Sequence, residues 1–511
     1  MKHLSTLSSK QTLILLVSLL IASFCGIIYE LIISSISSYL LGNSVYQFSV
    51  TIGFFMFAMG MGAMVTKYLN SKYIENFITI EIALAFFGGL SGIILFVVFP
   101  YARAYYEFFN LLLIFVIGAL VGMEIPLLTT VLSTFKSTKK SIADIMSFDY
   151  VGALIGALIF PIFLLPKMGL IQSSFFIGVL NLLAAAITSY FFWDQVVNKW
   201  KIKLYFISVS VLIVAGLIFS ESLTRFAEKN LYFDQIVLKE QTQYQKLIFT
   251  RSKVNSDHRL YIDGHIQFSS RDEYRYHEFL VHPILGLPGN KEKVLVLGGG
   301  DGLALREILK YPEVKSVTLV DIDQKMIDFG SKNATMRRFN LSAFDDPRVT
   351  SVAEDAFTFL NRSGDIYDRI IIDLPDPHNE ALNKLYSVQF YKLINRRLSP
   401  DGYVATQGSS PFFTPNTYWT IEKTLQVPFD NTASYHFSLP SFGIWGFHVA
   451  SNKDIKLDTA KFPPNTRAIT TESLMSATVF PKDISKPKYD LLPNSIMKPN
   501  LYILYSNEVN I

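Results

Sequence analysis

The pattern of hydrophobic and polar residues divides the chain into two halves. Over the first half, apolar stretches follow one another, and each is long enough to cross a bilayer as a helix. They cover roughly 11–34, 45–66, 77–99, 106–131, 144–165, 170–192 and 204–220. We therefore predict a multi-pass α-helical membrane domain over residues 1–222, with about seven transmembrane helices.

Short runs of strand-forming residues follow the apolar half. They are Asp234–Leu238, Lys246–Thr250, Leu260–Ile262 and His265–Phe268. Asp263 and Gly264 stand between the last two runs, and Asp-Gly favours a two-residue hairpin turn. A helical pattern over Arg271–His282 comes next. Residues 223–290 are thus predicted to form a small β-hairpin subdomain with a linking helix.

From residue 291 onward, strand and helix patterns alternate, which indicates a parallel sheet with right-handed crossovers. Val294–Leu297 is apolar throughout, as in a strand that is covered on both faces. Four glycines within residues 298–302 allow a tight turn, and Leu303–Lys310 has helical spacing. This order is typical of nucleotide binding. We predict an α/β Rossmann-like domain of the class I methyltransferase type over 291–455, and a C-terminal tail without a recognisable signature over 456–511.

Composition agrees with a membrane protein. Of the 511 residues, 50% are hydrophobic and 17% are charged, and the mean hydropathy is +0.31, which is too apolar for an ordinary soluble enzyme. Cys25 is the only cysteine, so the chain cannot form an internal disulfide. The net charge of +4 does not indicate a nucleic-acid partner.

Basic residues lie mainly on one side of the predicted membrane domain. The N-terminal side carries Lys2, Lys10, Lys67, Lys72, Lys136, Lys139, Lys140, Lys199, Lys201 and Lys203. The opposite loops carry Arg103 and Lys167. The positive-inside rule therefore predicts a cell-membrane protein with a cytoplasmic N-terminus. Seven spans would place the C-terminal half outside, unless the short stretch Leu204–Ser220 re-enters without crossing, so the side of that half stays open.

Four carboxylates lie inside the predicted spans, at Glu30, Glu81, Glu124 and Asp149. Acids are costly inside a bilayer. One interpretation is that they sit near span ends or take helix–helix hydrogen bonds. The other is that they form a path for a cation or an amine.

Acidic residues also follow successive strands of the predicted sheet. Asp301, Asp321, Asp355 and Asp373 each come at or just after a strand end, and Asp376 adds a fifth. In an open α/β sheet, ligands bind outside these carboxyl ends. Because like charges repel unless a cation neutralises them, five carboxylates around one crevice predict a polycationic ligand.

These motifs resemble the spermidine synthase family, the polyamine aminopropyltransferases, over about residues 240–450. The resemblance rests on Tyr244-Gln245, Leu260-Tyr-Ile-Asp-Gly-His-Ile-Gln267, Asp272-Glu-Tyr-Arg-Tyr-His-Glu278, Gly298-Gly-Gly-Asp-Gly302, Arg306-Glu307, Val320-Asp-Ile-Asp323, Glu354-Asp-Ala356, Asp373-Leu-Pro-Asp-Pro377 and Leu385-Tyr-Ser. Together with the apolar half, the chain resembles the membrane-anchored branch of that family.

The resemblance implies an enzyme that moves an aminopropyl group from decarboxylated S-adenosylmethionine to putrescine or a similar amine, giving spermidine and methylthioadenosine. It implies the donor as a co-substrate, with no cofactor and no metal. Asp373 would accept the proton, and Tyr276 and Asp376 would bind the amine. The donor would be held by Gln245, His277, Asp301, Asp321, Asp355 and Ala356. Soluble relatives form dimers or tetramers, so a homo-oligomer is an expected partner alongside the amine and the lipid bilayer.

Chemistry supports the decarboxylated donor, because the α-carboxylate of intact S-adenosylmethionine would be repelled by Asp301. The sequence departs from the family pattern around the acceptor: Asp321 replaces a more frequent Glu, His378 follows the Asp-Leu-Pro-Asp-Pro motif, and 439–443 lacks the amine-binding tyrosine. Two alternatives therefore stay open. One is an S-adenosylmethionine-dependent methyltransferase, and the other is a polyamine transporter with a nucleotide-binding regulatory domain.

Overall fold

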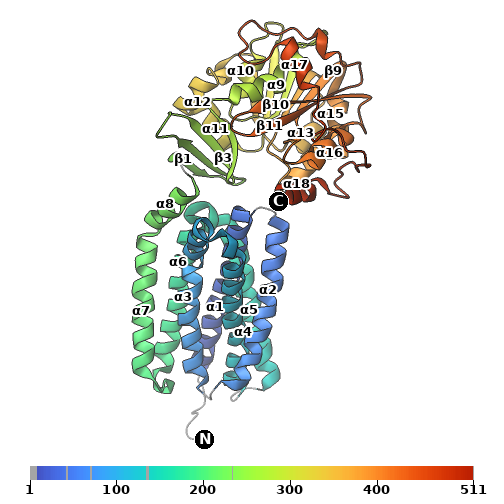
Figure 1. Cartoon of the computed structure of the whole chain (residues 1–511). Coiled ribbons are helices and arrows are strands. Elements are labelled where there is room, and N and C mark those ends of the chain that lie inside the picture. Colours follow the sequence, from blue (N-terminus) through green and yellow to red (C-terminus); the bar gives the residue numbers. More distant parts are fainter. Residues whose placement is uncertain (1–8, 42–43, 70–71, 134–136, 233, 510–511) are drawn as a thin grey trace. The chain divides into compact units, whose positions relative to one another are not determined.

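The computed structural model describes residues 9–41, 44–69, 72–133, 137–232 and 234–509 (Figure 1). Lys2 and Lys136, two of the basic residues used for orientation, lie outside these ranges. The chain forms two compact units, Met1–Phe233 and Asp234–Ile511. The first is called the helical unit and the second the sheet unit. The division follows the amphipathic helix α8 (Ser220–Leu231), which therefore belongs to the helical unit.

All seven apolar stretches are helical. The long helices are α1 (Ser9–Leu41), α2 (Ser44–Val65), α3 (Tyr73–Tyr101), α4 (Tyr106–Ser133), α5 (Thr138–Ile159), α6 (Leu165–Phe192) and α7 (Lys199–Ile218). By length and composition, six helical stretches of the described residues could cross a membrane. One of them, Thr138–Gln195, is 58 residues long and holds both the fifth and the sixth expected spans. Its backbone leaves the helical conformation at Gly169 (φ 68°), which divides it.

Helix α1 lies at the centre of the helical unit and packs against α2, α3, α4, α5 and α6. Its buried side chains take part in two apolar clusters, one with Ile28 and Ile32 and the other with Leu19. Helix α7 is mostly exposed and packs on α3 and α6. It is a continuous helix of 20 residues, which spans about 30 Å. The stretch considered for re-entry is therefore unbroken within Lys199–Ile218.

The sheet unit begins with a four-stranded antiparallel sheet in the order β1-β2-β3-β4. Its strands are β1 (Gln235–Gln241), β2 (Lys246–Arg251), β3 (His258–Ile262) and β4 (His265–Ser269). The hairpin turn between β3 and β4 is confirmed: Asp263 and Gly264 have φ of 49° and 85°, as a turn with two left-handed residues requires. Helix α9 (Glu273–Leu285) then leads to the main sheet.

The main sheet has seven strands in the order β10-β11-β9-β8-β5-β6-β7. They are β5 (Lys293–Gly298), β6 (Ser316–Asp321), β7 (Val349–Ala353), β8 (Tyr367–Asp373), β9 (Leu398–Gln407), β10 (Asn431–Leu439) and β11 (Gly443–Ser451). The strands β5 to β9 are parallel to one another, and β11 pairs antiparallel with β9 and with β10. The predicted fold class is confirmed.

Helices cover both faces of this sheet (Figure 1). Helix α9 packs against β8, β9, β10 and β11. The later helices of this unit are α10 (Leu303–Ile308), α11 (Gln324–Lys332), α12 (Ala334–Phe339), α13 (Ala356–Arg362), α14 (Glu380–Asn383), α15 (Val388–Arg397), α16 (Pro415–Leu425), α17 (Thr471–Ala477) and α18 (Leu501–Val509). Val294 and Val296 of β5 pack into one core, and Leu295 and Leu297 pack into the other. The uninterrupted apolar run of β5 follows from this burial on both faces.

The described part of the tail, 456–509, packs against the rest of the sheet unit. The buried carboxylate of Glu278 accepts hydrogen bonds from the backbone N–H groups of Arg467, Ala468 and Ile469 at 2.6–3.0 Å. Further along, Asn494 donates to the carbonyl oxygens of Asn383 and Tyr386, each at 3.0 Å. These bonds tie the tail down, and α18 lies near its end.

Candidate active site

The candidate site lies at the carboxyl ends of β5 and β8, the point where the connections of the parallel sheet reverse direction. Gly298 ends β5 and pairs with Asp373, which ends β8. A cavity of about 300 Å³ opens here, within the size range of small-molecule sites. All nine predicted site residues line it: Gln245, Tyr276, His277, Asp301, Asp321, Asp355, Ala356, Asp373 and Asp376.

The glycine turn brings two of the carboxylates to the cavity. Gly298 has φ of 84°, and a Cβ atom at this position would collide with the carbonyl oxygen of Asp373. A Cβ atom on Gly300 would lie 2.7 Å from an oxygen of Asp321. Glycine is therefore required so that the backbone turn can pass close to both strand ends.

Asp373, Tyr276 and His277 form the centre of the site. The hydroxyl of Tyr276 donates to Asp373 Oδ1 at 2.9 Å, and His277 Nε2 lies 3.9 Å from Asp373 Oδ2. Burial raises the pKa of Asp373, although His277 and the hydrogen bond from Tyr276 oppose that shift. Burial also raises the pKa of Asp301 to about 6, against the opposing charge of His277.

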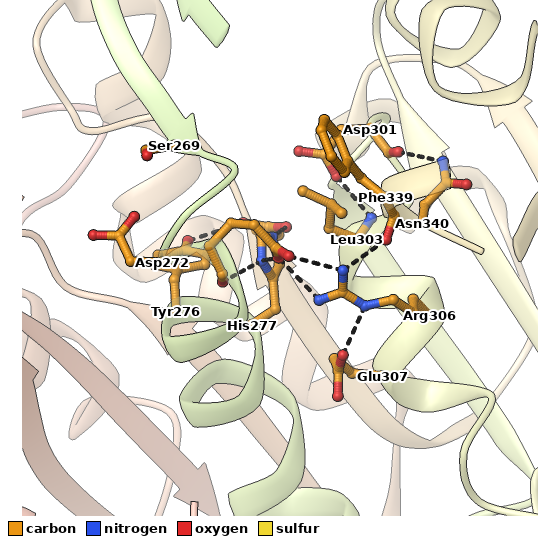
Figure 2. A network of polar contacts seen from close by, with 12 residues as sticks. Ser269, Asp272, Tyr276, His277, Asp301, Leu303, Arg306, Glu307, Phe339 and Asn340 are labelled. Carbon is orange, nitrogen blue, oxygen red and sulfur yellow. Dashed lines mark hydrogen bonds and ion pairs between the residues drawn. The ribbon is translucent and has the colours of Figure 1, made fainter. Parts of the chain in front are cut away.

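A buried ion-pair network holds His277 in place, and Figure 2 shows how its members converge. His277 Nδ1 donates to Glu273 Oε2 at 3.0 Å, and Arg306 donates to both oxygens of Glu273 at 2.8 and 2.9 Å. Arg306 Nε donates to Glu307 at 2.8 Å, and Glu307 also accepts from His282 Nε2 at 2.8 Å. We call Glu273, Arg306 and Glu307 the clamp.

Glu273 of the clamp, together with Asp301 and Asp373, determines the charge of His277. Burial disfavours its protonated form, but the hydrogen bond from His277 to Glu273 and the negative charges of Glu273, Asp301 and Asp373 raise the pKa of His277 to about 9. His277 is therefore protonated near neutral pH.

The same centre holds a group of potential metal ligands among the described residues. Ligand atoms of His277, Asp301 and Asp373 lie within 4.8 Å of one another. A metal would have to displace the proton of His277, because an imidazole with hydrogens on both ring nitrogens cannot coordinate it.

On the β6 side, Asp321 and Gln245 are held by local hydrogen bonds. Asp321 accepts from the N–H groups of Gly300 at 3.1 Å and Asp323 at 2.9 Å, and burial outweighs these bonds and raises its pKa to about 6. The side chain of Gln245 donates to Asp323 Oδ2 at 3.0 Å. Gln245 therefore reaches the cavity from the antiparallel sheet and joins that sheet to the end of β6.

At the β7 end, Asp355 also has a structural role. It caps the N-terminus of α13 by accepting from Thr358 N at 3.0 Å, and it pairs with Lys384 at 2.7 Å. Burial acts to raise the pKa of Asp355, but these contacts outweigh it and lower the pKa. Ala356, the first residue of α13, lies next to it on the cavity wall.

The far end of the cavity contains residues that sequence reasoning did not single out. Gln407 at the end of β9 donates to Asp376 Oδ1 at 3.2 Å, and Tyr505 of α18 donates to Asp376 Oδ2 at 3.0 Å. Burial raises the pKa of Asp376 to about 6. Phe442 and Trp445 also line this end, and the indole N–H of Trp445 has no hydrogen-bond partner among the described residues.

Comparison with known proteins gives a consistent result. A family model described as "Spermine/spermidine synthase domain" matches residues 273–460. The chain is 40% identical to the polyamine aminopropyltransferase of Leptospira interrogans serogroup Icterohaemorrhagiae serovar copenhageni, over 97% of this chain and 98% of that protein. It is 39% identical to the polyamine aminopropyltransferase of Oceanobacillus iheyensis, over 95% of each chain. It is 40% identical to polyamine aminopropyltransferase 1 of Streptomyces coelicolor, over 95% of this chain and 92% of that protein. These alignments include the helical unit.

Proposed function

The chain belongs to the spermidine synthase family of polyamine aminopropyltransferases, and we propose on that basis that it transfers the aminopropyl group of decarboxylated S-adenosylmethionine to putrescine, giving spermidine and methylthioadenosine. The observation that carries this proposal is the set of buried or half-buried carboxylates, Asp301, Asp321, Asp373 and Asp376, that line one cavity. Both proposed substrates are cations, so each can neutralise part of this set.

The donor fits the β5–β7 side of the cavity. Asp301 accepts the primary ammonium of the donor, and His277 beside it limits the negative charge that the pair Asp301 and Asp373 presents. Asp321 accepts hydrogen bonds from the ribose hydroxyls, as an acid at the end of the second strand does in this class of fold. Gln245 closes over the ribose from the antiparallel sheet, and Asp355 and Ala356 bind the adenine edge.

The transfer itself is a displacement at carbon. The lone pair of the amine nitrogen attacks the methylene carbon bound to the sulfonium, the carbon–sulfur bond breaks, and its electrons stay on sulfur as a neutral thioether. Alkylamines are protonated near neutral pH, because their pKa is about 10.4. Asp373 accepts the proton that the attacking nitrogen loses, and the hydroxyl of Tyr276, bonded to Asp373 at 2.9 Å, fixes the orientation of that carboxylate.

The acceptor fits between Asp373 and Asp376. Its reacting amine lies at Asp373, and its second ammonium bonds to Asp376 through a charge-assisted hydrogen bond. Gln407 donates to one oxygen of Asp376 and Tyr505 donates to the other. Each oxygen keeps a free lone pair, and these two lone pairs are directed toward the cavity.

A direct assay tests this function. The purified full-length protein is incubated with decarboxylated or intact S-adenosylmethionine and with putrescine, cadaverine or spermidine, and the products are identified by mass spectrometry. We expect spermidine and methylthioadenosine from the decarboxylated donor with putrescine. Methylated products from the intact donor would instead support the methyltransferase alternative.

We further propose that the helical unit lies in the cell membrane, which its six long apolar helical stretches support. The side on which the sheet unit faces is tested with a reporter fused after Ile511. The donor is made in the cytosol, so we expect activity of a reporter that works only in the cytoplasm. Activity of a reporter that works only outside would mean that the donor or another substrate is supplied there.

A further inference from the structure

We propose that Glu81 and Glu124 form an exchangeable proton-binding site inside the helical unit, a role separate from aminopropyl transfer. Glu81 on α3 is fully buried and Glu124 on α4 is 1% exposed. One oxygen of each carboxyl group, Oε1 in both cases, has no hydrogen-bond partner among the described residues. Buried polar oxygens without partners are rare, and each one requires an explanation.

The two carboxyl groups lie at the same depth. Glu81 is about 12 Å along α3 from Tyr73, and Glu124 is about 14 Å along α4 from Ser133. Because consecutive helices run in opposite directions, these distances start from the same end of the unit (Figure 1). The electrostatic interaction of Glu124 with Glu81 and with Asp149 of α5 agrees with this position. Both carboxyl groups therefore lie about a third of the way along their helices, which have 29 and 28 residues.

The surrounding groups supply no counter-charge. Asn181 of α6 donates to Glu81 Oε2 at 2.7 Å, and Tyr29 of α1 donates to Asn181 at 2.8 Å. Asp149 accepts from Ser23 at 2.5 Å. The sequence has no Lys, Arg or His within 11–66, 73–102, 104–135, 141–166 or 168–198. Within these ranges no basic side chain can therefore balance the acids, which leaves a proton or another cation from outside them.

Electrostatics favour the smallest cation. A Cβ atom on Gly88 would collide with the ring of Tyr29, and a Cβ atom on Gly152 would collide with the carbonyl oxygen of Leu20, so α1 packs closely against α3 and α5. Two ionised carboxylates buried together cost several kcal/mol each, whereas a proton on one of them removes the repulsion. The structure therefore assigns a proton as the occupant, as in the carboxylate relays of proton-coupled membrane proteins.

Infrared difference spectroscopy of the full-length protein in liposomes tests the site. A protonated carboxyl group has a carbonyl stretch that an ionised one lacks. We expect a pH jump to remove this band in the wild-type protein, and we expect the band to be absent from Glu81→Gln/Glu124→Gln. A band that does not respond to the pH jump would overturn the proposal. So would loss of the band at constant pH when Na⁺ or spermidine is added, because either would identify a different occupant.

A second measurement needs no variant and so does not depend on how a variant folds. A hydrophobic carbodiimide adds to protonated carboxyl groups, and peptide mass spectrometry locates the adduct. We expect labelling of Glu81 or Glu124 that falls about tenfold per pH unit above the titration point, and no labelling of Glu107, an exposed acid on the same helix as Glu124. Labelling that does not change with pH, or labelling of Glu107 to the same extent, would contradict the assignment. Aminopropyl transfer is assayed in the same preparations, so failure of the proposed function is seen separately.

Discussion

Both units of this protein bury several carboxylates, but they surround them in different ways. In the sheet unit, Asp301 and Asp373 lie beside the protonated His277 and open into a cavity. In the helical unit, Glu81 and Glu124 lie among closely packed helices, and each has an oxygen without a partner among the described residues. The first arrangement is suited to a large cationic substrate that enters and leaves. The second is suited to a proton, which needs almost no space.

The comparison shows why the number of acids alone does not reveal function. What distinguishes the two sites is the supply of hydrogen-bond donors. Backbone N–H groups at strand ends and the clamp satisfy the acids of the sheet unit, since Asp321 accepts two N–H groups and Glu273 accepts two bonds from Arg306. A transmembrane helix has no free N–H groups in its middle, so its acids depend on side chains or protons.

The largest effect is expected from Asp373→Asn. Loss of the proton acceptor should lower turnover roughly 10²- to 10⁴-fold, while binding of the donor persists because other residues hold it. The rate is measured by product formation and the binding by titration calorimetry. The control is Asp365→Asn, an exposed acid just before the same strand, which should keep the wild-type rate. A variant of Asp373 with more than half the wild-type rate would refute the assigned role.

Glu273→Gln should destabilise the sheet unit. It removes the charge that pairs with Arg306 and His277, and removal of one partner from a buried ion pair costs about 3–5 kcal/mol. The expected result is a lower unfolding midpoint and faster amide hydrogen exchange in α9. Glu292→Gln, which breaks the exposed pair with Lys315, should change little. Equal behaviour of the two variants would mean that the clamp is not a stabilising network.

Asp301→Ala should relax the choice of donor. The carboxylate attracts the ammonium of the decarboxylated donor and repels the additional carboxylate of the intact one. Both donors carry the ammonium, so their affinity ratio depends on the repulsion of the extra carboxylate; juxtaposed like charges cost several kcal/mol, and the ratio should fall by about tenfold or more. Calorimetric titration with each donor measures the ratio. An unchanged ratio would remove Asp301 from donor selection.

Burial of the acids in the sheet unit should appear in the pH dependence of the reaction. Asp301, Asp321 and Asp376 each have a pKa raised to about 6. They are ionised above that pH and bind cations, and they become neutral below it. We expect kcat/KM to fall about tenfold or more per pH unit below pH 6, because kcat/KM reports groups of the free enzyme. A decline that begins only near pH 4, the ordinary range of exposed aspartates, would contradict this.

Much of this architecture is predictable from local sequence. The apolar run of β5, the Asp263-Gly264 turn and the acids at the strand ends depend on short-range patterns, and all nine predicted site residues line one cavity. The clamp was not predictable: Glu273 and Arg306 belong to motifs, but their bidentate pairing depends on how α9 packs against α10. Nor was Tyr505, because a contact with Asp376 across 129 residues leaves no periodic signal in the sequence.

Tyr505→Phe should have the smallest effect, and it tests whether α18 belongs to the acceptor site. Tyr505 donates to Asp376 Oδ2 at 3.0 Å and lines the cavity. Loss of this bond allows the carboxylate to rotate away from the second ammonium of the amine. A single hydrogen bond contributes about 1 kcal/mol, so KM for the amine should rise about fivefold, with KM for the donor and kcat unchanged.

Tyr502→Phe, on the same helix but outside the cavity lining, is the matched control. If Tyr505→Phe and Tyr502→Phe both leave KM for the amine unchanged, α18 only covers the sheet unit; if the two raise KM for both substrates, the helix acts through general stability. A selective rise for Tyr505→Phe would show that the C-terminal tail takes part in recognising the amine.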